Sequence, residues 1–382
     1  MDPELEKITR RSEAAIRSKE YDRLIKQSYE DKVHRSLNLV DEFVSILGLD
    51  RVYVATSGGK DSACLSKLCK QKFPQIKHYM FDTGLEYQAT LRLAKKQGAI
   101  ILKPTASWIE FCEKEGYPVG SKQVSKRLHD VDSGVISCCI SLFSKNYGLS
   151  NCWLHFLDRS LIKFPISHKC CNEFKKKPGR CLKLNPIIGT RTEESSLRKS
   201  AWRKSGCNSF SIDYTKGVSR PISLWTDQDV EQYIVEESVE LSEIYTQYEA
   251  KRTGCVNCPY GAQLDGSRFD LLKRLEPQRY DHFMNHSHLK EILAFSNVDI
   301  GTDPEYTAYK KHIQKIVARW HEKAKGNDQY LTWKLQFALE RYSSDELRKG
   351  IEHISKYPMK VEKESILLKL QELERIEPGT HC

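Results

Sequence analysis

A Ser-Gly-Gly-Lys-Asp-Ser run at residues 57–62 constrains the fold more than any other feature of this chain. It follows the apolar stretch 51–55, which predicts a buried strand, and it precedes residues 63–68, which predict the start of a helix. Adjacent glycines let the backbone approach an anion closely, and the helix start, the lysine and the serine hydroxyls supply donors. The run therefore indicates a phosphate-binding turn, and a turn in which the glycines serve only a tight bend is the less favoured interpretation.

The chain around this run alternates between strand and helix patterns. Expected strands at 51–56, 76–82, 99–103 and 184–190 are separated by helical patterns, which predicts an α/β fold with a parallel sheet covered on both faces. Ligands of such sheets bind at the carboxyl ends of the strands. The segments at those ends are Ser57 with its turn, Asp82-Thr83-Gly84 and Gly189-Thr190-Arg191. We therefore expect them to converge on one crevice.

Length and composition set the outer limits of this interpretation. A chain of 382 residues with 39% hydrophobic residues suits an α/β domain with a sizeable appendage. The expected ranges are a helical N-terminal segment (1–48), the α/β domain with its cysteines (49–264) and a helical C-terminal region (265–382). No apolar run approaches eighteen residues and the acidic start is unlike a signal peptide, so no membrane contact and a cytoplasmic location are expected.

Positive charge is concentrated in one segment, residues 159–204. This segment holds 13 Lys and Arg against three Glu, an excess equal to the net charge of the whole chain, +10. A polyanionic ligand is implied. Because arginine presents a rigid fork to phosphate or sulfate, Arg191 and Arg198 are the expected anion clamps. The lysines at 175–177 are either a solvated face or a contact for nucleic acid backbone or a protein partner.

Four of the 13 cysteines have the spacing of a metal centre. Cys170 and Cys171 are adjacent, and Cys255 and Cys258 form a Cys-x-x-Cys pair, with 83 residues between Cys171 and Cys255. Adjacent cysteines chelate a single small ion poorly, yet they can reach two irons of a cluster, and the second pair can reach the other two. An iron–sulfur cluster is therefore expected, with zinc as the second choice and four buried thiols as the third.

Four segments together resemble the phosphoadenosine phosphosulfate (PAPS) reductase-like family of the PP-loop ATP pyrophosphatase superfamily. They are Ser57–Ser62, Phe81–Glu86, Gly189–Ser195 with Arg198, and Pro221–Val230, in the order of the family and over roughly residues 50 to 260. The cysteine pattern is similar to that of adenylylsulfate reductases, which hold a [4Fe-4S] cluster. The resemblance implies an adenine nucleotide alpha hydrolase-like fold and a site for ATP or an adenylyl sulfonucleotide with Mg²⁺.

The resemblance also implies roles for individual residues. Lys60 would neutralise developing charge, Asp61 or Asp82 would position Mg²⁺, and Arg191 would clamp the second anion. The nucleotide-binding set comprises Ser57, Gly58, Gly59, Lys60, Asp61, Ser62, Asp82, Thr83, Gly84, Gly189, Arg191, Ser195 and Arg198, and the cluster ligands are Cys170, Cys171, Cys255 and Cys258.

The C-terminal tail departs from the reductases of this family. Their tail reads Glu-Cys-Gly-x-His and its cysteine attacks sulfur, whereas this chain has Pro378 at that position and a cysteine only at Cys382. The expected activity is therefore ATP cleavage between the α- and β-phosphates, with adenylation coupled to sulfur transfer, as in DNA phosphorothioation and tRNA thiolation enzymes. The alternatives are a reductase of adenylyl sulfate or PAPS, and a non-catalytic nucleotide-binding subunit of a mobile-element or defence system that docks a partner through its C-terminal helices.

Overall fold

The computed structural model describes residues 16–104, 106–134, 142, 149–250, 253–301, 303–323, 327–354 and 362–375. The tail at 377–382 lies outside these ranges. The chain divides into two compact units, of which the first is Met1–Thr105 with Cys171–Val256 and the second is Ala106–Cys170 with Asn257–Cys382. Each unit thus combines two separate stretches of chain. The contiguous ranges 1–48, 49–264 and 265–382 stay predictions.

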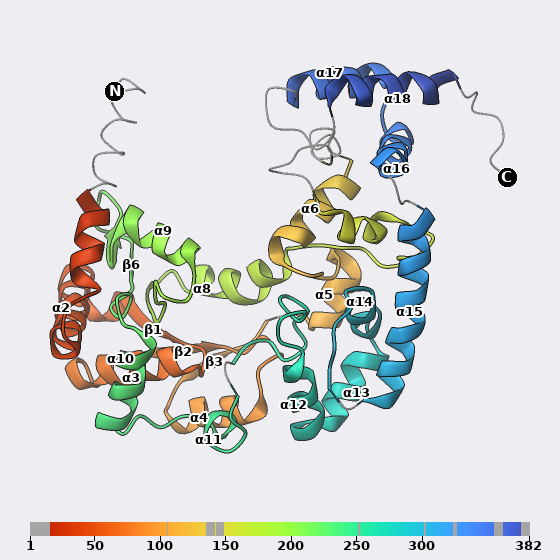
Figure 1. The fold of residues 1–382 in the computed structure, drawn as a ribbon. Coiled ribbons are helices and arrows are strands. Elements are labelled where there is room, and N and C mark those ends of the chain that lie inside the picture. Colours follow the sequence, from red (N-terminus) through yellow and green to blue (C-terminus); the bar gives the residue numbers. More distant parts are fainter. Residues whose placement is uncertain are drawn as a thin grey trace. The chain divides into compact units, whose positions relative to one another are not determined.

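The first unit is built around a twisted sheet (Figure 1). Its strands are β1 (Val52–Thr56), β2 (His78–Phe81), β3 (Ile100–Leu102), β4 (Asn185–Ile188), β5 (Asn208–Phe210) and β6 (Gly217–Ser219). Its helices are α2 (Tyr29–Leu47), α3 (Lys60–Lys72), α4 (Gln88–Lys96), α8 (Lys177–Cys181), α9 (Ser196–Ser205), α10 (Asp227–Glu236) and α11 (Glu243–Thr246), with short helical turns η1 (Leu49–Arg51) and η4 (Asn172–Lys176).

The strand order is β3-β2-β1-β4-β6-β5, and β5 alone runs antiparallel within this sheet of the described residues. The predicted α/β class and its four parallel strands are confirmed. The β5–β6 hairpin was not predicted, because each strand has only three residues and neither Asn-Ser-Phe nor Gly-Val-Ser forms an apolar run.

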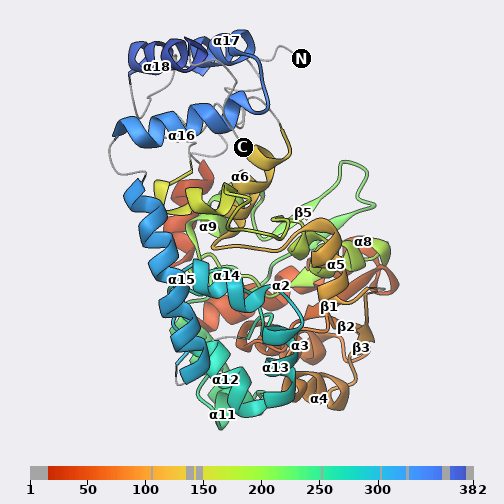
Figure 2. The same cartoon turned by 90° about the vertical axis from the view of Figure 1, so that its right-hand side faces the viewer.

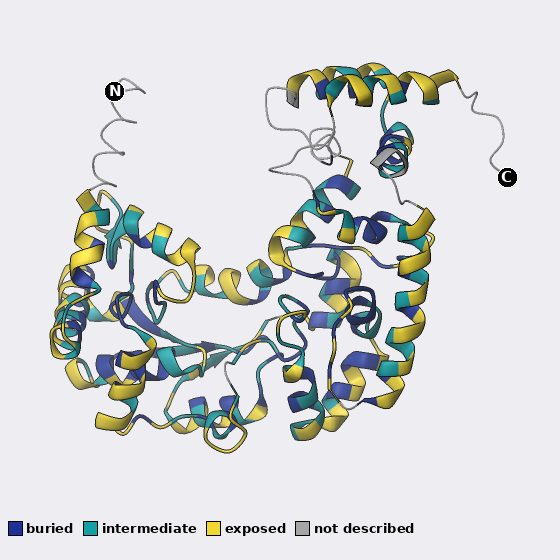
Figure 3. Cartoon of the chain, in the orientation of Figure 1, coloured by how far each residue is buried: buried dark blue, intermediate teal, exposed yellow. Residues whose placement is uncertain are grey.

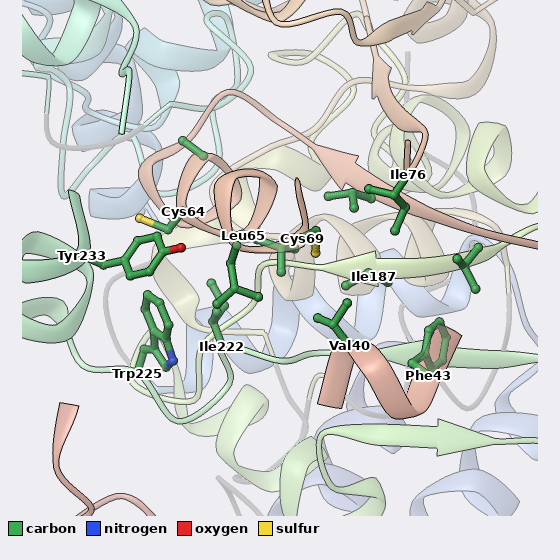
Figure 4. Close-up of a cluster of buried hydrophobic side chains, with 14 of the residues drawn as sticks. Val40, Phe43, Cys64, Leu65, Cys69, Ile76, Ile187, Ile222, Trp225 and Tyr233 are labelled. Atoms are coloured by element: carbon green, nitrogen blue, oxygen red, sulfur yellow. The ribbon is translucent and has the colours of Figure 1, made fainter. Parts of the chain in front are cut away.

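Both faces of the sheet are covered. Val52 and Val54 of β1 pack into a core with α2, α3 and α10, shown in Figure 4 with Leu65 of α3 and Trp225 before α10. Tyr53, which lies between Val52 and Val54, points to the opposite face of the sheet. There a Cβ on Gly179 of α8 would lie 3.1 Å from the Tyr53 hydroxyl. This alternation follows the two-residue period of a strand. Figure 3 shows the strands largely buried or intermediate in exposure.

Helix α2 belongs to the same core as the sheet. Lys32 of α2 makes a buried ion pair of 2.7 Å with Asp229 of α10. Asp229 also closes a capping box, since its carboxylate accepts from the Thr226 backbone N–H at 2.6 Å while the Thr226 hydroxyl accepts from the Asp229 N–H. The Trp225 indole donates to Ser36 of α2 at 2.9 Å. These contacts explain why the N-terminal helix forms one unit with the sheet.

The second unit is helical. It contains α5 (Trp108–Glu115), α6 (Lys122–Asp132), η3 (Asn151–Leu157), α12 (Ser267–Leu275), α13 (Pro277–Asn285), α14 (Leu289–Phe295), α15 (Pro304–Lys323), α16 (Asn327–Leu339), α17 (Ser344–Ile354) and α18 (Lys363–Arg375). The helical pattern predicted beyond residue 265 is confirmed for the described residues. Helices α16, α17 and α18 share a small apolar core of their own, including Leu335, Ile351 and Leu370 (Figure 2). Among the described helices, none is both long and apolar enough to span a membrane.

Candidate functional site

The candidate anion site lies where β1 meets α3 in the first unit. The turn Ser57-Gly58-Gly59 joins them, and Ser62 in the first turn of α3 folds back on it. Its hydroxyl accepts the Ser57 backbone N–H at 3.2 Å and donates to the Gly59 carbonyl at 2.9 Å. Ser62 therefore fixes the shape of the turn at the positive end of a 13-residue helix, which favours an anion.

Two glycines permit close approaches around this turn. Gly58 has a φ of +72°, and a Cβ there would lie 2.0 Å from Cγ2 of Thr90, next to the start of α4. Gly189 follows β4, and a Cβ there would lie 3.1 Å from the Asp61 carbonyl and 3.2 Å from the Ser62 nitrogen. The predicted convergence of the 57–62 and 189–191 segments is thus observed, and glycine permits it.

We expect the substitution Gly58→Ala to lower the free energy of unfolding by about 2–4 kcal/mol, because it combines overpacking against Thr90 with a left-handed φ. Urea denaturation measures this value. Gly98→Ala is the matched control, since Gly98 has a φ of +77° and nothing within 4 Å of its Cβ position. It should cost only about 1–2 kcal/mol. The double variant with Thr90→Ser should recover the difference, and equal losses for Gly58→Ala and Gly98→Ala would contradict the close contact.

Arg191 is buried and surrounded by carboxylates. Its Nε lies 3.0 Å from Asp61, Nη2 lies 2.7 Å from Asp227, and Nη1 lies 3.2 Å from Glu193. Burial acts to lower the pKa of this guanidinium, but Asp61 and Asp227 outweigh it, so the pKa is raised and the charge is fixed. The arrangement orients Asp61 at the start of α3. A direct clamp of Arg191 on a second anion stays a prediction.

Arg198 lies on α9, next in the chain after these groups. The Ser195 hydroxyl caps α9 by accepting the Arg198 backbone N–H at 3.3 Å, and the Arg198 guanidinium pairs with Glu194. Burial lowers the pKa of Arg198, Asp61 acts to raise it, and Arg191 acts to lower it further. Arg198 thus lies within electrostatic range of both groups, and its role as an anion clamp stays a prediction.

The loop after β2 carries the other predicted residues. The carboxylate of Asp82, itself buried, accepts the Gly84 backbone N–H at 2.9 Å. Glu86 accepts the Thr83 backbone N–H at 2.8 Å and its hydroxyl at 2.9 Å, which closes the loop. Burial raises the pKa of Glu86, against these bonds and the nearby ammonium of Lys175. Because β1 and β2 are parallel neighbours, this loop ends at the same edge as the phosphate turn.

The four predicted cysteine ligands divide between the two units. Cys171 and Cys255 belong to the first unit. Cys171 precedes the π-helical turn η4. Cys255 is followed by Val256, whose backbone N–H donates to the Leu85 carbonyl at 2.8 Å. Cys170 and Cys258 belong to the second unit. The second unit also places Cys112 near these two cysteines, which the cysteine spacing in the sequence did not predict. Burial raises the pKa of the Cys112 thiol, and its hydrogen bond with Cys170 and the nearby Cys258 act in the same direction.

The chemistry of these thiols suits a cluster, since iron–sulfur clusters are held by cysteine sulfur. Among the residues that the structure describes, however, no group of three or more His, Cys, Asp or Glu is arranged to hold a metal ion. The four-cysteine centre, whether iron–sulfur or zinc, therefore remains a prediction.

Tyr245 and Thr253 complete the surroundings of the phosphate turn. A Cβ on Gly59 would lie 3.1 Å from the Thr253 hydroxyl and 3.7 Å from the Tyr245 hydroxyl. Sequence reasoning missed both residues, because a tyrosine in an irregular polar stretch and a threonine before a Cys-x-x-Cys carry no local signal. Their distance in sequence from the turn hid the contact.

Comparisons with known proteins find similarity over part of the chain. A family described as "Phosphoadenosine phosphosulfate reductase domain" matches residues 154–260. An uncharacterized protein of Methanocaldococcus jannaschii is 24% identical over 276 residues, which is 70% of this chain and 55% of that protein. The chain thus spans about half the length of this curated relative.

Among solved structures, the phosphate complex of PAPS reductase from Candida auris aligns with 63% of this chain and 93% of its own, at 15% identity and a TM-score of 0.35. Two of the four sequence segments, Gly189–Ser195 and Pro221–Val230, lie within the matched residues 154–260. This part of the chain is therefore similar to the phosphoadenosine phosphosulfate reductase domain family.

Proposed function

We propose that this protein binds ATP at the 57–62 turn, cleaves it between the α- and β-phosphates, and couples the resulting adenylation to sulfur transfer. The observation that carries the proposal is the ion pair between Asp61 and Arg191 at the start of α3, 3.0 Å apart, beside the Ser57–Ser62 hydroxyl contact of 3.2 Å. A carboxylate fixed next to an anion-binding helix start suits a Mg²⁺–polyphosphate ligand.

In this proposal an acceptor oxygen attacks the α-phosphorus, a new P–O bond forms, and the bond to the β-phosphate oxygen breaks to release pyrophosphate. Lys60 and the first backbone N–H groups of α3 neutralise the charge that develops on the leaving pyrophosphate. Asp61 or Asp82 positions Mg²⁺, and Arg191 holds Asp61 in place. A sulfur donor of the hydrosulfide class then attacks the acceptor atom that bears the adenylated oxygen. A bond to sulfur forms and the bond to that oxygen breaks, so that AMP leaves. Cys170, Cys171, Cys255 and Cys258 would hold a [4Fe-4S] cluster, with one thiolate on each iron, and it would supply a redox-active group.

A second candidate is reduction of PAPS or adenylyl sulfate. The family match over residues 154–260 favours it, because that family is described by this reductase. The same turn would then hold a sulfonucleotide, and Arg198 would meet its sulfate or 3′-phosphate. The two candidates share the nucleotide site and differ in the bond that breaks.

Product analysis separates the candidates. Anaerobically purified protein is incubated with Mg²⁺ and either ATP or adenylyl sulfate, with a dithiol reductant and sulfide present, and the products are identified by mass. We expect AMP and pyrophosphate from ATP, with water replacing the acceptor oxygen as the nucleophile. Release of sulfite from adenylyl sulfate would replace the proposal with the reductase, and turnover of neither would leave a nucleotide-binding subunit.

A further inference from the structure

Tyr245 in α11 lies directly against the phosphate turn of the first unit. The Lys60 ammonium sits 5.5 Å from the centroid of its ring, within the range of a cation–π contact. The Tyr245 hydroxyl would lie 3.7 Å from a Cβ on Gly59. One side chain therefore borders both the charged residue and the glycine that the turn presents to an anion.

The hydroxyl of Tyr245 forms a second set of contacts. It accepts the Thr253 backbone N–H at 2.9 Å and lies 3.1 Å from the Thr253 hydroxyl. Burial raises the pKa of this phenol, while Thr253 and the nearby Lys60 backbone N–H act to lower it. The hydroxyl thus holds the start of the segment that leads into Cys255.

We propose that Tyr245 is a positioning residue for the phosphate turn: its ring holds the Lys60 ammonium at the anion site, and its hydroxyl holds Thr253 beside Gly59. The inference rests on the proposed nucleotide site and adds a residue that affects how strongly that site binds phosphate. A lysine side chain loses rotamer freedom when it contacts an anion. Because the ring already restricts the side chain, less conformational entropy is lost on binding.

A backbone contact of a residue that follows Thr253 explains why Thr253 is held in place. Val256, three residues on, donates its backbone N–H to the Leu85 carbonyl at 2.8 Å, in the loop after β2. The segment 253–256 is therefore attached at one end to the phosphate turn and at the other to the neighbouring strand end. Tyr245 is therefore held by its contacts with the segment 253–256.

The test compares three variants by isothermal titration with ATP and with adenosine. Tyr245→Leu removes ring and hydroxyl and should weaken ATP binding roughly twofold to thirtyfold, the span of cation–π contacts. Tyr245→Phe keeps the ring and should retain most of the affinity. Neither variant should change adenosine binding, because adenosine has no phosphate for Lys60 to meet. Tyr248→Leu is the matched control, since Tyr248 is 40% exposed in the same stretch, and it should bind ATP normally.

The adenosine measurement distinguishes positioning from a merely structural role. Equal weakening of ATP and adenosine by Tyr245→Leu, or unchanged ATP affinity, would overturn the inference while the proposed site stands. Equal loss in the Phe and Leu variants would also overturn the role of the ring. A wild-type protein that binds neither ATP nor adenylyl sulfate would overturn the proposed function, and this inference with it.

Discussion

A protein carrying Gly59→Val is expected to fold normally and to lose ATP binding. Gly59 has φ −79° and ψ 160°, an extended conformation that valine adopts readily, so the backbone is not strained. A Cβ there already lies 3.1 Å from the Thr253 hydroxyl and 3.6 Å from the Ser57 hydroxyl. The added methyl groups therefore fill the space that phosphate oxygens need, while the sheet behind the turn is untouched.

Lys60→Ala should have the same result for a different reason. It removes the charge at the first residue of α3 but leaves a good helix former there. Isothermal titration with ATP measures binding, and circular dichroism confirms the fold. Lys67→Ala, an exposed lysine on the same helix, is the matched control and should bind normally. Unchanged affinity in either site variant would place the nucleotide elsewhere.

Loss of iron is the second large effect that we expect. Anaerobically purified protein should be brown and contain about four irons per chain. Single substitution of Cys170, Cys171, Cys255 or Cys258 by serine should remove the colour and most of the iron, because serine oxygen replaces thiolate poorly. The yield of folded protein should fall as well, since metal binding links segments that are distant in sequence.

Cys181→Ser is the matched control for the cysteine series. Cys181 is exposed, lies ten residues after Cys171 at the end of α8, and is outside the predicted ligand set. Its substitution should leave iron content unchanged. Elemental analysis giving one zinc and no iron per chain would replace the cluster with a zinc site. Metal content unaffected by all four ligand substitutions would contradict a cysteine-held centre altogether.

The central strands of the fold were predictable because their signals are local. The apolar runs that became β1 and β4 are bounded by glycine turns, and the capping box at Thr226 is a four-residue pattern. The two compact units were not predictable in the same way. The chain leaves the first unit after Thr105 and returns at Cys171, and no composition change marks those points.

For the candidate site, sequence order was enough to group Ser57, Asp61 and Arg191, because parallel strands end at one edge. The role of Arg191 was harder to foresee. The positive charge of residues 159–204 indicated an anion clamp, whereas the fold surrounds Arg191 with three carboxylates. Tyr245 was missed because its contact with Lys60 spans 185 positions and follows from packing alone.

A crystal structure with Mg²⁺ and α,β-methylene ATP, which cannot be cleaved at the proposed bond, tests the central claim most directly. We predict phosphate oxygens within hydrogen-bond distance of the backbone N–H groups of Gly59 and Lys60, with the Lys60 ammonium turned toward them. Nucleotide bound away from the 57–62 turn, with this turn still closed on Tyr245 and Thr253, would contradict the account.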